Sequence, residues 1–186
     1  MQNEVSKHSK KTVIFHWLVG LSMITVLIMG MYMVENKVFS LYYWHRSLGL
    51  SLFIFAIYRL ILRVKEGLPK PKLSYTKIEK NLSRLVQILL LASTILMPIS
   101  GILMTTMNGF GMILFDLVIV AANPDPSNPR LMLPINSSLG DLSKTIHVTC
   151  GWIMAGTLLL HVSGAMKHHI IDRDDTLKSM LRLKSN

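Results

Sequence analysis

The stretch TIHVTCGWIMAGTLLLHVSGAMKHH, residues 145–169, is apolar and long enough to cross a lipid bilayer, which takes about 20 helical residues. Two histidines, His147 and His161, nevertheless lie within its apolar run. Ionisable side chains at membrane depth are costly and usually have a function. They are fourteen positions apart, which makes nearly four helical turns, about 21 Å. The two imidazoles therefore share one helix face, with one ring near each membrane boundary.

The rest of the chain is similarly apolar, with 51% apolar and 16% charged residues among 186 and a mean hydropathy of +0.43. This composition predicts an all-α integral membrane protein, a four-helix transmembrane bundle in a single domain over residues 1–186. The expected helices lie near residues 13–34, 45–63, 84–107 and 144–166.

Two shorter segments lie between the third and fourth windows. Residues 111–120 are apolar but too short to span a membrane and include Asp116, so we expect an interfacial or re-entrant piece. The following NPDPSNP, residues 123–129, is expected to be irregular.

Lysine and arginine are distributed unequally between the two sides of this four-helix arrangement. Sixteen fall on one side and four on the other, which by the positive-inside rule predicts that both termini are cytoplasmic. The net charge of +10 then reflects topology and attraction to anionic lipid, and no nucleic-acid partner is expected. The four outer cations are Lys37, Arg46, Arg130 and Lys144.

Two more histidines match the first two in depth. His16 lies on the cytoplasmic side of the first helix and is level with His161, whereas His45 opens the second helix on the outer side and is level with His147. Facing imidazoles in a helix bundle are what a haem with two axial histidines requires. A zinc site is disfavoured because each level offers only two histidines, without cysteine or nearby carboxylates.

Glycines accompany the four histidines and could give a porphyrin ring room against the backbone. Each follows a histidine by three or four residues, which is one helical turn. They are Gly20, Gly49, Gly151 and Gly164. The alternatives stay open, because a lone histidine near a helix end is often merely interfacial and membrane helices use glycine for packing. Cys150 is the single cysteine, so no Cys-x-x-Cys-His motif for covalent haem attachment is present.

Several motifs resemble those of the bacterial cytochrome b561 family. They are HW at 16–17, HRSLG at 45–49, RLILR at 59–63, MPISGILM at 97–104, IHVTCG at 146–151 and LHVSGAMKHH at 160–169. The resemblance implies an inner-membrane cytochrome with two haem b groups, one held by His16 and His161 on the cytoplasmic side and one by His45 and His147 on the periplasmic side. It also implies exchange with ubiquinone, the donor being superoxide in the superoxide oxidase type or a periplasmic redox partner in other relatives.

A haem with both axial positions filled has no open site for oxygen, so we expect electron transfer. Lysine and arginine side chains near each membrane face could form ion pairs with the haem propionates. Such residues also serve as ordinary snorkelling anchors. The candidates are Arg46 and Lys144 outside, and Arg59, Arg63 and Lys167 inside. Arg46 and Lys144 could also steer superoxide, since positive potential raises encounter rates with small anions.

His168 is the candidate for a quinone site, because it follows His161 by seven residues and returns to nearly the same face. The alternative is that the Lys-His-His run only marks the helix exit at the lipid headgroups. Two other functions stay open: a quinol-fed relay to a periplasmic or dehydrogenase partner without catalysis of its own, and a haem-free proton-coupled transporter.

Overall fold

The computed structural model describes residues 9–67 and 75–181, which are mostly helical. Four helices are long and apolar enough to cross a membrane, which confirms the prediction of an all-α membrane bundle. They are α1 (Lys10–Glu35), α2 (Leu41–Glu66), α3 (Lys77–Met107) and α4 (Ser137–Ile170). A short helix, α5 (Thr176–Leu181), follows α4.

The helices extend past the predicted windows because polar residues cap them beyond the apolar runs. Ser9 accepts the Thr12 N–H at 3.1 Å at the start of α1. Thr76 and Glu79 form a reciprocal capping box at the start of α3. The polar ends of the helices thus reach beyond the apolar core that a hydropathy window detects.

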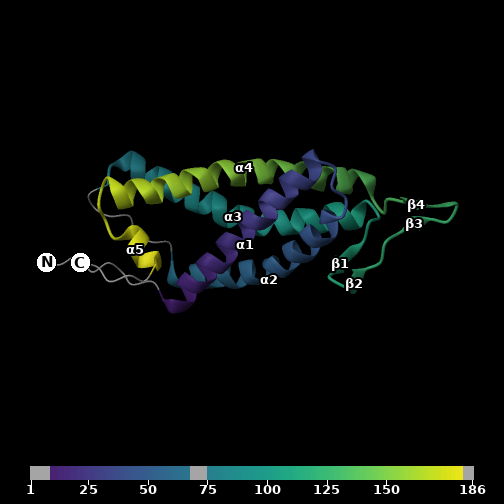
Figure 1. The fold of residues 1–186 in the computed structure, drawn as a ribbon, viewed down its shortest axis with the longest axis horizontal. Coiled ribbons are helices and arrows are strands. Elements are labelled where there is room, and N and C mark those ends of the chain that lie inside the picture. Colours follow the sequence, from purple (N-terminus) through teal and green to yellow (C-terminus); the bar gives the residue numbers. More distant parts are fainter. Residues whose placement is uncertain (1–8, 68–74, 182–186) are drawn as a thin grey trace.

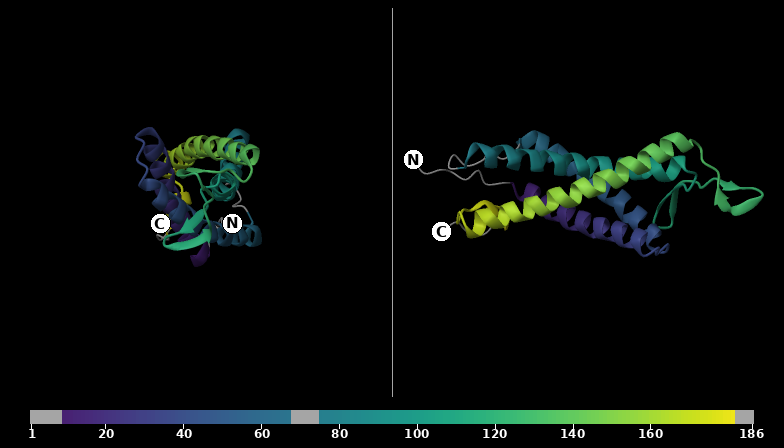
Figure 2. Two further views of the ribbon diagram at one scale, coloured as in Figure 1. Left: turned by 90° about the vertical axis from the view of Figure 1, so that its right-hand side faces the viewer. Right: turned by 90° about the horizontal axis from the view of Figure 1, so that it is seen from above.

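The long helices form two antiparallel pairs, α1 with α2 and α3 with α4 (Figures 1 and 2). Buried side chains from all four helices meet midway along the bundle. This core cluster consists of Val19, Met23, Leu27, Leu52, Ala56, Met97 and Met154. It lies between the predicted inner and outer histidine levels and separates them.

At one end of the bundle, which is predicted to face outward and is called the outer end, two β-hairpins connect α3 to α4 (Figure 1). The opposite end is called the inner end. The first pairs β1 (Met112–Leu114) with β2 (Leu117–Val120), and the second pairs β3 (Pro124–Asp125) with β4 (Asn128–Met132). Gly109 permits the exit from α3, because it adopts a φ of 81° and a side chain there would meet the Leu133 carbonyl.

The expectation that residues 123–129 are irregular was wrong. They turn tightly between β3 and β4, because the Asp125 carboxylate accepts hydrogen bonds from the Ser127 N–H at 2.8 Å and hydroxyl at 2.6 Å. Such a local side-chain turn lets a proline-rich segment form a short hairpin.

The inner end of the bundle is closed by contacts between distant segments. The Trp17 indole N–H donates to the Met180 carbonyl at 2.8 Å, so α5 is tied to α1. Glu66 at the end of α2 accepts hydrogen bonds from Ser9 at 2.7 Å and Thr12 at 2.6 Å. Figure 1 shows α5 at the end of the bundle opposite the hairpins.

Candidate haem sites

The four histidines lie as two facing pairs at opposite ends of the bundle. The ring centres of His16 and His161 are 6.1 Å apart, with an angle of 60° between ring planes. The ring centres of His45 and His147 are 6.2 Å apart, at 82°. Each pair joins a helix from one antiparallel pair to α4 in the other, so each lies between the two halves of the bundle.

The separation within each pair suits two axial ligands of one iron. A metal–imidazole bond of about 2 Å, with the ring centre about 1 Å beyond the nitrogen, places two such ring centres roughly 6 Å apart. Both observed distances match this value. The residues present therefore fit a haem at each level, while the ligand role itself remains a prediction.

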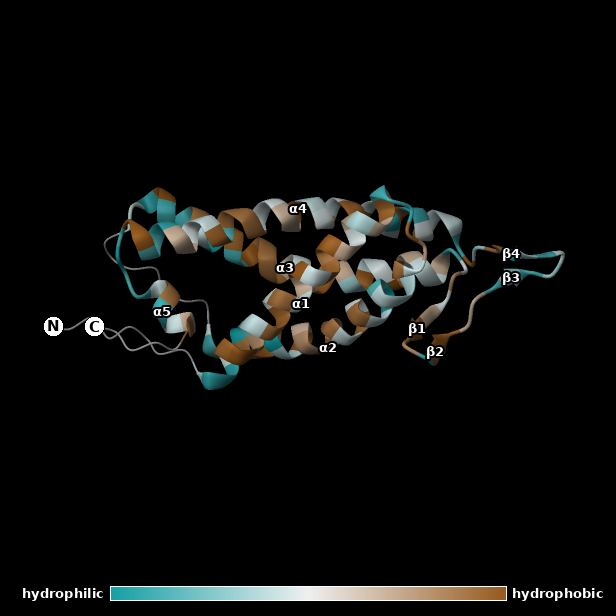
Figure 3. Ribbon diagram, viewed as in Figure 1, coloured by the Kyte–Doolittle hydropathy of each residue, from teal (hydrophilic) through white to brown (hydrophobic). Residues whose placement is uncertain are grey.

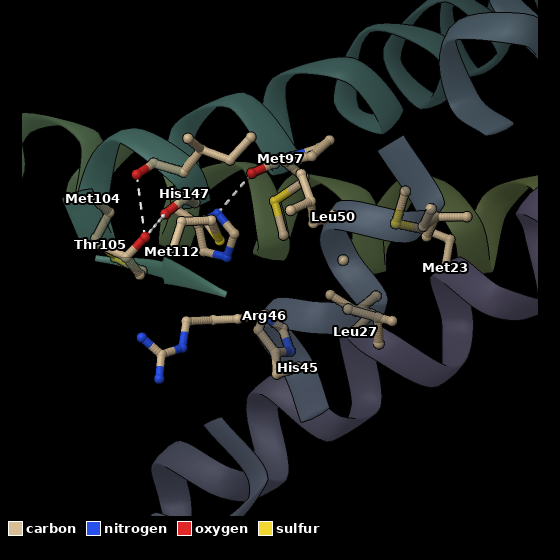
Figure 4. Close-up of a pocket in the computed structure, with 16 residues that line it drawn as sticks. Met23, Leu27, His45, Arg46, Leu50, Met97, Met104, Thr105, Met112 and His147 are labelled. Atoms are coloured by element: carbon tan, nitrogen blue, oxygen red, sulfur yellow. Dashed lines mark hydrogen bonds between the residues drawn. The ribbon is translucent and has the colours of Figure 1, made fainter. Parts of the chain in front are cut away.

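The outer pair borders a cleft that is partly open to the surroundings (Figure 4). Apolar side chains form most of the lining, including Leu27, Leu50, Met97 and Met112. The cleft thus surrounds the space beside the two imidazoles with apolar side chains.

The His147 ring is oriented by α3. Its Nδ1 lies 2.9 Å from the Met97 carbonyl oxygen and 3.2 Å from the Ser100 hydroxyl. A carbonyl can only accept, so His147 carries its proton on Nδ1 and its Nε2 is available as a ligand. Metal-binding histidines typically donate their second nitrogen in this way.

Two glycines that the sequence analysis missed are packed against the outer rings. A Cβ on Gly30 would lie 2.9 Å from Cε1 of His45, and one on Gly101 would lie 3.1 Å from Cε1 of His147. Gly30 could have been found from the sequence, because it follows His16 by fourteen residues and therefore lies on the same face of α1, at the outer level. Gly101 falls within the MPISGILM motif, but its proximity to His147 depends on how α3 packs against α4.

The predicted glycines divide into two groups. Among the described residues, no other part of the chain lies within 4 Å of a Cβ built on Gly20, Gly49 or Gly164, so space is open beside them. Gly151 instead contacts Met97 at 3.7 Å and Leu27 at 3.9 Å, as in ordinary helix packing. Clearance for a haem stays a prediction at all four positions.

At the inner pair, Arg59 of α2 lies 3.2 Å from Nδ1 of His16, measured from its Nη2 atom. A guanidinium only donates, so His16 accepts here and its neutral form carries the proton on Nε2. Ligation of iron through Nε2 requires the opposite arrangement. If His16 binds haem iron through Nε2, Arg59 has to turn away from Nδ1.

The other predicted cations differ in their surroundings. Arg46 lines the outer cleft, and its Nε donates to the Tyr42 carbonyl at 3.3 Å. Lys144 is exposed and is not among the residues that line that cleft. Arg63 donates to the Gly67 carbonyl at 3.1 Å, at the end of α2. Lys167 is ion-paired with Glu79 at 2.5 Å and Asp172 at 2.8 Å.

His168 belongs to a polar cluster at the inner end. Its Nδ1 lies 2.6 Å from the Asp172 carboxylate, and its ring stacks on Tyr75 with ring centres 4.3 Å apart. The Tyr75 hydroxyl donates to Asp174. Hydrogen bonds from Lys167 and His168 lower the pKa of Asp172, whereas burial, followed by the bond to Asp174, raises the pKa of Tyr75 to about 12. The sequence analysis missed this cluster, because Tyr75 lies far along the chain from residues 167–174.

A bundle of membrane-spanning helices with facing histidine pairs in its interior defines the class of haem-binding membrane cytochromes. Residues 7–183 match the family described as prokaryotic cytochrome b561, and the chain belongs to this family. It is also similar to cytochrome b561 homolog 2 of Escherichia coli (strain K12), with 28% identity over 177 residues covering 92% of this chain and 89% of that protein. The chain is therefore a membrane electron-transfer protein, and its family implies haem b binding.

Proposed function

We propose that this cytochrome binds two haem b groups, one between His16 and His161 and one between His45 and His147. It would lie in the bacterial inner membrane with both termini cytoplasmic, and carry electrons between the periplasmic face and the quinone pool. The observation that supports this most directly is the presence of two ring pairs, 6.1 and 6.2 Å apart, at opposite ends of one bundle.

Haem held by two histidines supplies reversible one-electron transfer without an open position for oxygen. The protein's part is to fix the rings and exclude water. The Met97 carbonyl and Ser100 hydroxyl orient His147. The apolar cluster around Met23 and Met154 fills the space between the two levels.

The proposed electron donor is superoxide at the outer face, and the proposed acceptor is ubiquinone. Two superoxide anions each lose one electron and become dioxygen, while one ubiquinone gains two electrons and two protons to form ubiquinol. Support comes from Arg46, whose positive charge lies at the outer cleft beside His45. Lys144 adds positive charge on the same side, and such charge favours the approach of an anion.

Quinone reduction also requires protons, and we place this step near the inner pair. His168 is the proposed proton-exchanging group, and the contact with Asp172 would orient its ring. We propose that the propionates of the inner haem are held by Arg59, Arg63 and Lys167. At Lys167, a propionate would compete with the carboxylates of Glu79 and Asp172.

Ligand assignments can be tested by alanine variants and absorbance spectra. His16→Ala and His161→Ala should lose the same haem, and His45→Ala and His147→Ala should lose the other. Haem content should fall from about two per chain to about one in each case, with all haem extractable by acidified solvent. Loss of the same haem in the His16→Ala and His45→Ala variants would contradict the pairing. A colourless wild-type preparation would favour the haem-free transporter.

Stopped-flow absorbance can test the donor and acceptor. Superoxide should reduce the haems of the wild type, Arg46→Glu should slow this step, and added salt should weaken it. Arg130→Glu, the same charge change on the outer β3–β4 hairpin, is the matched control. Ubiquinone should then reoxidise the haems, with His168→Ala slowing only this second step. If superoxide leaves the haems oxidised while a quinol reduces them, the protein is a quinol-fed relay.

A further inference from the structure

The β1–β2 hairpin exposes an unusual apolar strand at the outer end of the bundle. All four residues of β2, from Leu117 to Val120, are exposed, with Leu117 at 60% and Val118 at 62%. Leu117 and Val118 lie before the β-bulge of this strand and point to opposite faces, so both faces of β2 are apolar and uncovered. An exposed strand of this kind in water would promote aggregation.

The surface of β2 continues into the apolar surface of α2. The rings of Trp44 and Phe115 meet edge to face with centres 6.2 Å apart, and both side chains are exposed. The Tyr43 hydroxyl donates to Asp116 in the hairpin turn at 3.2 Å. Tryptophan and tyrosine concentrate where membrane helices enter the headgroup region. The hairpin therefore lies at the depth where α2 enters the membrane.

The same hairpin forms part of the outer cleft. The Phe115 N–H donates to the Ser47 hydroxyl at 2.9 Å, and Ser47 is fully buried within α2. Met112 of β1 is buried and lines the cleft beside His147 (Figure 4). One side of the hairpin is thus fixed to the bundle, while β2 faces away from it.

We propose that β2 is a membrane-docking surface that inserts among the lipids of the outer leaflet, at the boundary between headgroups and acyl chains. Lipid at this depth covers both faces of the strand, whereas a second copy paired along its edge would leave both faces exposed. Headgroups and interfacial water can satisfy the unpaired backbone groups of β2, which the hydrocarbon interior cannot. Figure 3 shows the contrast with the β3–β4 hairpin, whose tip is hydrophilic.

The proposal can be tested by spin labelling of the full-length protein in lipid nanodiscs. A Cys150→Ala background removes the native thiol, and Leu117→Cys and Val118→Cys then place labels on opposite faces of β2. Ser127→Cys, in the turn between β3 and β4, is the matched control. Power saturation compares access to dissolved oxygen, which enriches in lipid, with access to a water-soluble nickel chelate. Unchanged haem absorbance verifies folding of each variant.

Labels at 117 and 118 should be more accessible to oxygen than to the nickel chelate, and the label at 127 should show the reverse. Labels at 117 and 118 that match the label at 127 would overturn the proposal, because β2 would then face water. Labels accessible to neither reagent would also overturn it, and dipolar broadening between labels would then identify a second copy as the cover.

Discussion

At the scale of single residues, the two histidine pairs differ in what surrounds their second ring nitrogen. His147 Nδ1 faces an acceptor, the Met97 carbonyl, while His16 Nδ1 faces a donor, Arg59. Glycines at the outer level add a second difference, because Gly30 and Gly101 bring the helix backbones close to the imidazole rings. The outer site therefore depends on close packing that any added side chain would disturb.

Gly30→Ala should disturb the outer site selectively. The new methyl group would lie 2.9 Å from the His45 ring, and overpacking of this kind costs about 1–3 kcal/mol. Retention of the outer haem should fall by roughly 10- to 100-fold, measured as haem per chain after dilution with a haem-binding competitor. Gly156→Ala is the control, since no other part of the chain that the structure describes lies within 4 Å of its Cβ position. Equal haem loss in both variants would contradict this account.

Sequence could predict the histidines and their depth, because helical periodicity and membrane topology fix both. It could not predict which atoms lie next to each ring. The Arg59 contact with His16 and the Gly101 contact with His147 depend on the rotation and crossing of helices far apart in the chain. Apolar residues surround most of each membrane helix, so their pattern leaves that rotation undetermined.

At the scale of elements, the four long helices follow directly from hydropathy, but the smaller elements do not. The β-hairpins depend on local turns at Asp116 and Asp125 that hydropathy does not register. The position of α5 depends on Trp17, which binds the Met180 carbonyl, and on Asp174, which accepts from the Thr176 N–H at 2.8 Å and from Tyr75. These links hold the inner end of the bundle together.

The attachment of α5 should weaken at alkaline pH. Tyr75 has a pKa of about 12, above the value near 10 of an unfolded tyrosine. Its stabilising contribution is therefore complete below about pH 10 and is lost as the pH rises towards 12. Amide hydrogen-exchange protection in Thr176–Leu181 should fall over this range. Tyr75→Phe should lower protection at neutral pH and remove the alkaline step, and an unchanged step would exclude Tyr75 as its cause.

At the scale of the whole molecule, the distribution of positive charge and the arrangement of the helices both favour the same orientation in the membrane. The described cations of the inner end include Arg59, Arg63 and Lys167, whereas those of the hairpin end include Arg46, Arg130 and Lys144. Four spanning helices bring the start of α1 and the end of α4 to the same side, which is the end where α5 contacts α1. The single-domain assignment and the membrane orientation remain predictions.

Reporter fusions can test the orientation. Green fluorescent protein fused after residue 186 should fluoresce, because it folds in the cytoplasm, and alkaline phosphatase in the same place should be inactive. Phosphatase inserted at Ser127, in the exposed turn between β3 and β4, should be active. Active phosphatase at the C-terminus would contradict the proposed topology and indicate the opposite orientation.

The contact between Arg59 and His16 has a consequence for the order in which the mature protein is assembled. On the proposed assignment, the outer site is ready for its cofactor as soon as the helices pack, whereas the inner site first requires Arg59 to leave Nδ1 of His16. Cells short of haem should therefore accumulate a half-filled protein with its cofactor at the outer level. In His45→Ala cells, which can fill only the inner level, maturation should be slower than in His161→Ala cells, which can fill only the outer one.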